Sequence, residues 1–87
     1  LNPSNIDAIE NKGLTLGELG KNEEAMACFD KILELKPDFS DAYYQKGLIL
    51  AKLGKREEAI ECLKTAVKID PSFQEANNVL QAISQSN

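Results

Sequence analysis

The residues of this chain that could carry chemistry are its carboxylates and two cysteines. The 87 residues include 14 aspartates and glutamates, two cysteines and no histidine. There is also no nucleophile elbow, no glycine-rich phosphate loop and no paired His/Cys set for a metal. The carboxylate pairs fall on what we expect to be exposed helical faces, where nothing would raise a pKa. We therefore expect no enzyme activity, no cofactor and no bound metal.

Cys28 and Cys62 are too few for a disulfide framework. They take the same place in the second helices of two successive helix pairs that we expect. Neighbouring packed helices lie about 8 to 10 Å apart, which is beyond the reach of a disulfide without backbone movement. We interpret both cysteines as small, partly buried packing residues and expect a reducing, cytoplasmic location.

The charge pattern limits the classes of partner. The net charge is −4, and the lysines are interleaved with glutamates, so no basic patch is available for a nucleic acid. The longest apolar runs are only a few residues, far short of a bilayer span, so we expect no membrane partner either.

The elements that must position these residues come from an internal repeat of about 34 residues. Shifting the sequence by that length brings Pro3, Pro37 and Pro71 into one column. It also aligns Lys12-Gly13-Leu14 with Lys46-Gly47-Leu48, Leu19-Gly20-Lys21 with Leu53-Gly54-Lys55, Glu23-Glu24-Ala25 with Glu57-Glu58-Ala59, and Cys28 with Cys62. The chain therefore repeats one structural unit.

Each unit is predicted to contain two amphipathic helices, because its apolar residues recur at spacings of three and four. Gly20 and Gly54 are expected to end the first helix of each unit in the left-handed conformation. Ser4, Asp38 and Ser72 each precede a carboxylate by three residues, close to a capping box, and are expected to cap the helices that follow.

The repeated unit resembles the tetratricopeptide repeat. The resemblance is carried by Gly13, Ala25, Phe29 and Pro37, and again by Gly47, Ala59, Leu63, Ala66 and Pro71. The usual tryptophan of the first helix is Ile9 or Tyr43 here, and lysines replace the leucine before the glycine, substitutions that packing tolerates.

The resemblance implies an all-α, TPR-type helix-turn-helix solenoid with five helices, forming a single domain over 1–87. Its expected parts are the tail of an upstream repeat (1–5), repeat 1 (6–39), repeat 2 (40–73) and a capping helix (74–87). In that last segment Ala76, Leu80 and Ile83 share one side, and Asn77, Gln81 and Gln85 share the other. We interpret the chain as the C-terminal end of a longer array.

The family's first helices line a concave groove that commonly takes a peptide or helix of a partner protein. By register, the peptide-binding positions of this chain are Asp7, Glu10, Asn11, Leu14, Glu18, Asp41, Tyr44, Gln45, Leu48, Lys52, Glu75 and Asn78, followed by Val79 and Ala82. The alternative is that they are simply the solvated faces of amphipathic helices. The mixture predicts a partner segment with basic and apolar side chains. Tyr43 is expected in the core and Tyr44 in the groove.

One subtype of the family is not expected. Its members grip the C-terminal carboxylate of chaperone tails with a basic, asparagine-containing clamp, whereas this chain has Glu10, Leu14, Gln45, Glu75 and Val79 at the matching positions. An anionic peptide end would meet repulsion there instead of charge-assisted hydrogen bonds.

Self-assembly is the second hypothesis. Solenoids generally need about three repeats to bury enough surface, and this chain has two and a closing helix. Ile9 and other apolar residues at the N-terminal end could remain exposed, which would favour a homodimer through that end.

Overall fold

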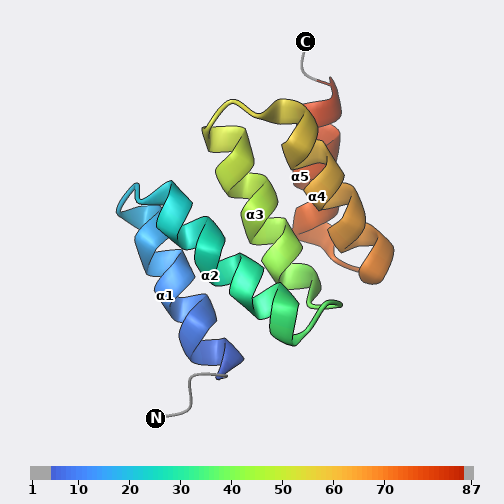
Figure 1. Cartoon of the computed structure of the whole chain (residues 1–87). Helices are drawn as coiled ribbons and strands as arrows, with labels where there is room; N and C mark the ends of the chain where they lie inside the picture. The colour runs from blue at the N-terminus through green and yellow to red at the C-terminus, as the bar shows by residue number, and fades with distance from the viewer. Residues whose placement is uncertain (1–4, 86–87) are drawn as a thin grey trace.

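The computed structural model describes residues 5–85, which form a stack of five α-helices (Figure 1). The helices are α1 (Ile6–Glu18), α2 (Asn22–Leu35), α3 (Ser40–Lys52), α4 (Arg56–Ile69) and α5 (Gln74–Gln85). Helices α1 and α2 form one hairpin, α3 and α4 form the second, and α5 packs against α4. This confirms the expected all-α helix-turn-helix solenoid. Most of the expected upstream tail, 1–4, and the last two residues of the capping segment lie outside the described residues.

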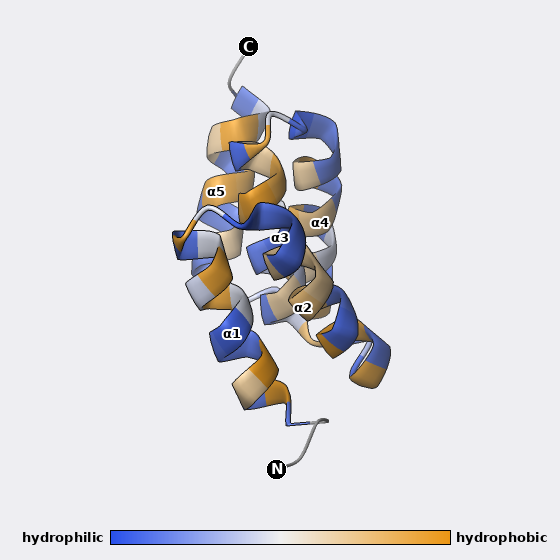
Figure 2. Cartoon of the chain, turned by 60° about the vertical axis from the view of Figure 1, so that its left-hand side comes forward, coloured by the Kyte–Doolittle hydropathy of each residue, from blue (hydrophilic) through white to orange (hydrophobic). Residues whose placement is uncertain are grey.

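The stack is elongated, with extents of 44 × 27 × 17 Å, and the first and last helices, α1 and α5, lie towards its opposite ends (Figures 1 and 2). Figure 2 shows hydrophobic and hydrophilic residues alternating around the helices, as the amphipathic pattern predicts. None of the helices within residues 5–85 is both long and apolar enough to cross a bilayer.

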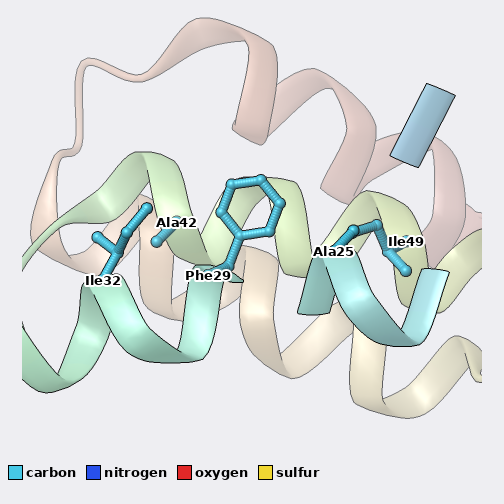
Figure 3. Close-up of a cluster of buried hydrophobic side chains, with 5 residues drawn as sticks. All are labelled: Ala25, Phe29, Ile32, Ala42 and Ile49. Carbon is cyan, nitrogen blue, oxygen red and sulfur yellow. The ribbon is translucent and has the colours of Figure 1, made fainter. Parts of the chain in front are cut away.

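The core lies between successive hairpins. One buried cluster joins α2 to α3 and consists of Ala25, Phe29, Ile32, Ala42 and Ile49. Figure 3 shows the Phe29 ring between the Ile32–Ala42 pair and the Ala25–Ile49 pair. A second cluster, Leu63, Ala66 and Ala76, joins α4 to α5. Helix α2 thus packs against α1 on one side and α3 on the other. Its Asp30 also forms an ion pair with Lys46 of α3, with Oδ1 and Nζ 2.6 Å apart.

The two helices of each hairpin approach each other closely at a glycine. A Cβ placed on Gly13 would lie 2.9 Å from Cζ of Phe29. At Gly47 it would lie 2.9 Å from Cγ of Leu63 and 3.3 Å from the carbonyl oxygen of Ala59. The two 2.9 Å contacts are shorter than real Cβ atoms show, so a larger residue at either position would force the facing side chain or the helix to shift.

The first helix of each hairpin ends as predicted. Gly20 and Gly54 both have φ of +81°, in the left-handed region. The Gly20 amide donates to the carbonyl of Gly17 at 3.1 Å, and the Lys21 amide donates to the carbonyl of Leu16 at 2.8 Å. This Schellman pattern satisfies carbonyls that the helix end leaves unpaired.

The predicted N-terminal caps were wrong where the structure describes them. Helix α1 is capped by Asn5, whose Oδ1 accepts from the Ala8 amide at 3.3 Å, while Ser4 lies outside the described residues. The N-cap of α3 is Phe39, not Asp38, and Ser72 donates to the Asp70 side chain at 2.7 Å. Phe39 and Phe73 pack against the two core clusters. Because the two rings are held against the core, α3 begins after Phe39 and α5 begins after Phe73. Both helices therefore start later than the predicted caps Asp38 and Ser72 imply.

A pair of glycine substitutions tests the close approach within the second hairpin. We expect Gly47→Ala to lower the free energy of unfolding by about 1–3 kcal/mol, because the added methyl overpacks against Leu63. Gly17→Ala is the matched control: it is also a helical glycine, but a Cβ there meets nothing within 4 Å. That variant is expected to gain about 0.5–1 kcal/mol from helix propensity. Urea unfolding of both variants measures the difference, and equal effects would contradict this packing.

Candidate functional site

Helices α1, α3 and α5 together line a hollow of about 560 Å³. Five of the predicted groove residues contribute to its walls: Leu14, Glu18, Gln45, Leu48 and Lys52. Val79 of α5 joins them, as expected. We call this hollow, with the predicted positions that flank it on the same three helices, the groove.

The floor of the groove is apolar. Leu14 is 37% exposed, and Leu48, Val79 and Ile83 are half-buried. The ring of Phe29, although it belongs to α2 and to the core, also lines the hollow. Its Cζ lies against Gly13, but Phe29 is only 1% exposed. The accessible floor is therefore formed by Leu14, Leu48, Val79 and Ile83.

The rim of the hollow carries Glu18 and Lys52. The ammonium group of Lys52 donates to the carbonyl oxygen of Gly17 at 3.3 Å, so it links α3 to the last turn of α1. The C-terminal carbonyls of a helix are unpaired and partly negative, which favours a cation there. The one lysine among the predicted groove residues is thus engaged by the protein's own backbone.

The other end of the groove is acidic. The carboxyl groups of Glu10 on α1 and Asp41 on α3 share a hydrogen bond, which is the largest cause raising the pKa of Glu10 to about 7. Burial raises it further, as do the negative charges of Asp41 and Asp7. The expectation that nothing would raise the pKa of a carboxyl group was therefore wrong. The missing signal was the approach of two helices, which brings together residues far apart in sequence.

Tyr44 stands beside this acidic end and also contributes to the core. Its ring centroid lies 5.0 Å from that of Phe73, with the planes tilted by 48°. Burial raises the pKa of its hydroxyl, with further contributions from Glu75 and Asp41. Tyr43 and Tyr44 are both half-buried against the same cluster. The expected division, with Tyr43 in the core and Tyr44 in the groove, is thus incomplete, because Tyr44 serves packing as well.

The remaining predicted residues are not brought into the hollow. Asn11 and Asn78 are exposed on α1 and α5, and Ala82 lines a neighbouring hollow of about 310 Å³ with Ala51, Arg56 and Ile83. Sequence reasoning missed six lining residues: Gly13, Gly17, Phe29, Ile49, Ala51 and Ile83. Repeat register could have found two pairs, since Gly17 and Ala51, and likewise Ile49 and Ile83, occupy the same position of consecutive repeats.

Within residues 5–85 no group of three or more histidine, cysteine, aspartate or glutamate side chains is placed to hold a metal ion. The groove combines an open apolar floor with a group of acidic residues in which the pKa of Glu10 is raised to about 7. Such a surface can bind apolar and cationic side chains at the same time.

Two models of the same protein family match this chain. A family model described as "TPR repeat" matches residues 13–54, and one described as "Tetratricopeptide repeat" matches residues 40–73. A search of curated protein sequences gives no significant match.

Several solved structures are similar over nearly the whole chain. The first TPR of Spaghetti (RPAP3), bound to the HSP90 peptide SRMEEVD, is 27% identical with a TM-score of 0.88, over 97% of this chain and 67% of that one. YrrB, described as a TPR protein with an unusual peptide-binding site, is 31% identical with a TM-score of 0.90, over 93% of this chain and 42% of that one.

The second TPR domain of human RPAP3, in complex with the HSP70 peptide SGPTIEEVD, is 24% identical with a TM-score of 0.87. That match covers 98% of this chain and 71% of the other, and it supports the fold alone. The chain thus spans about two thirds of the Spaghetti structure and less than half of YrrB.

The shared proton of Glu10 predicts that stability falls as the pH rises from about 4.5 to about 7. The folded chain holds this proton more tightly than the unfolded chain, so the folded state loses stability once the group must ionise. We expect Glu10→Gln to leave stability nearly unchanged near pH 4 and to raise it near pH 8. The gain should be on the order of 1 kcal/mol, because solvent screens this half-exposed group.

Urea unfolding at both pH values measures this effect. Glu34→Gln, at an exposed position of α2 that does not contribute to the acidic cluster, is the control and should show no such pH-dependent difference. An equal effect of Glu10→Gln at both pH values would contradict the shared proton.

Proposed function

The chain belongs to the tetratricopeptide-repeat family, and from this premise we propose that it is a protein-interaction module that binds a segment of a partner protein in the groove. The observation that carries the proposal is the open apolar floor beside the Glu10–Asp41 pair. An exposed apolar hollow with a few convergent polar groups is the usual form of a binding site. The similarity to the peptide-bound Spaghetti repeat and to YrrB supports the same function.

The groove favours a segment with basic and apolar side chains. A lysine or arginine placed between Glu10 and Asp41 would replace their shared proton and form charge-assisted hydrogen bonds. An apolar side chain would fill the hollow between Leu14, Leu48 and Val79. Lys52 offers little attraction for an acidic partner, because it already donates to the backbone of α1.

We propose that the chain is not a receptor for chaperone tails, although the Spaghetti repeat is bound to such a peptide. The peptide SRMEEVD ends in acidic residues. Glu10 and Glu75 stand at positions where a carboxylate-binding clamp would need cationic or amide side chains. Like charges would therefore oppose binding.

Homodimerisation remains the alternative function, and one observation favours it. Ile9 and Leu16 line a separate hollow of about 430 Å³ on the first hairpin, at the end of the stack opposite α5 (Figure 1). A strict monomer at high concentration in analytical ultracentrifugation would remove this alternative. We also propose a cytoplasmic location, which the two free thiols, Cys28 and Cys62, support.

Alanine substitution tests the groove. Peptides selected from a library rich in lysine, arginine and large apolar residues are expected to lose about fivefold to thirtyfold in affinity for Leu14→Ala, because an apolar contact in the hollow is lost. Leu35→Ala is the matched control: Leu14 is 37% exposed and Leu35 is 40% exposed, but Leu35 lies outside the groove. Isothermal titration calorimetry measures both, and equal losses would show that the peptides bind elsewhere.

The peptide SRMEEVD provides a separate test of partner chemistry. At physiological salt we expect no measurable affinity, since the acidic residues of the peptide face Glu10 and Glu75. Micromolar binding would overturn the proposed preference for basic partners while leaving the groove itself in place.

A further inference from the structure

Helix α5 forms one wall of the groove, and it contributes Val79 and Ile83 to the hollow. Near its first turn, α5 is anchored by apolar packing, because Ala76 is fully buried in the cluster that joins α4 to α5. Towards its last turn the packing is looser: Ile83 is only half-buried, and the residues on either side of it are exposed. Apolar packing therefore holds the two ends of this wall unequally.

Arg56 of α4 makes a polar contact at the looser end. Its Nε donates to the carbonyl oxygen of Ile83 at 3.2 Å, and its Nη2 donates to the same oxygen at 2.8 Å. Arg56 is the first residue of α4 and Ile83 lies in the last turn of α5, so the bonds tie together two helices that lie side by side (Figure 1). Hydrogen bonds from a cation are stronger than neutral ones, and the planar guanidinium group holds both donors in a fixed geometry.

Two of the groove helices receive a cation for their last turn from a neighbouring helix. The last turn of α1, as described over Ile6–Glu18, has no basic residue of its own, and the same is true of α5 over Gln74–Gln85. Lys52 of α3 donates to the carbonyl of Gly17 in α1, and Arg56 of α4 does the corresponding service for α5. A cation is favourable at these carbonyls, because the helix leaves them unpaired and partly negative. Each contact therefore ties one groove wall to the rest of the stack.

The first repeat does not share the contact made by Arg56. The matching residue there is Asn22, the first residue of α2. Its Oδ1 is buried and has no hydrogen-bond partner within residues 5–85. Helix α2 is instead joined to α3 by the ion pair between Asp30 and Lys46. The two Arg56 hydrogen bonds are thus particular to the wall formed by α5.

Arg56 lies directly behind this wall. The neighbouring hollow of about 310 Å³ is lined by Arg56 together with Ala51, Ala82 and Ile83. Ala51 and Ile83 also line the hollow of the groove, so the two hollows share a boundary. A shift of Ile83 towards the smaller hollow would widen the larger one. Because Arg56 holds the backbone of Ile83, it opposes that shift.

We propose that Arg56 is a positioning residue for the groove: by holding the carbonyl of Ile83, it sets how closely the hollow encloses an apolar side chain of the bound segment. Arg56 acts through Ile83, which lines the hollow of the groove, whereas Arg56 lines the neighbouring one. This proposal rests on the proposed function, because it concerns the same site.

Calorimetric titration of two peptides tests this role. One peptide is selected as for the Leu14→Ala experiment, and the second is the same peptide with its largest apolar residue changed to alanine. Arg56→Met keeps an apolar stem but removes the N–H donors, and we expect it to weaken the first peptide by about threefold to tenfold. It should leave the affinity of the second peptide almost unchanged, because an alanine does not reach the wall. A general loss of stability would weaken both peptides alike, so the difference between them isolates the effect on the hollow.

Two further variants separate the hydrogen bonds from the charge. Lys55→Met removes the same charge from the adjacent, exposed residue and should change the affinity of neither peptide. Arg56→Lys should recover most of the affinity for the first peptide, because the ammonium group of Lys52 already holds a carbonyl of α1 in this way.

Hydrogen exchange of the free chain provides a readout that needs no peptide. The backbone amides in the last turn of α5 should exchange faster in Arg56→Met than in Lys55→Met, because the end of the helix opens more often. Unchanged exchange would overturn the proposal, as would a first peptide that binds Arg56→Met normally or two peptides that are weakened equally. Each of these results leaves the proposed function in place. Failure of the selected peptide to bind the unaltered chain would contradict the proposed function itself, and this proposal with it.

Discussion

Each hairpin depends on a contact between a glycine and a large apolar side chain of the facing helix, Gly13 with Phe29 and Gly47 with Leu63. These contacts set the helix separation, and that separation positions everything else. They place Phe29 in the core between α2 and α3 and directly behind the floor of the groove. A change that fills the space above Gly13 would therefore disturb both the core and the shape of the groove.

The acidic end of the groove has a structural origin. Asp7, Asp41 and Glu75 all lie in the first turn of their helices, where a carboxylate is stabilised by the helix dipole. Because α1 and α3 run side by side, these charges gather at one end of the groove, and the pKa of Glu10 is raised to about 7. A cation from a partner would relieve this repulsion. The apolar hollow at the other end of the groove would bind an apolar side chain of the same partner and so fix the orientation of the partner segment along the groove.

Features set within one repeat could be predicted from the sequence, and features set between repeats largely could not. Gly20 and Gly54 adopt the left-handed conformation that their position after a helix requires, and the apolar spacing predicted all five helices. The shared proton of Glu10, the double role of Tyr44 and the contribution of Ile83 to the hollow depend on how far apart neighbouring helices lie. The caps were missed for a related reason: Phe39 is fixed by the core, and that tertiary contact prevails over the local preference of Asp38.

The most direct test of groove binding is the position of a bound peptide containing basic and apolar residues, determined from intermolecular NOEs to assigned methyl groups. We expect NOEs from its apolar side chain to Leu14, Leu48 and Val79, which face one another across the hollow. NOEs confined to exposed apolar residues outside the groove, such as Leu35 and Ile69, would contradict it.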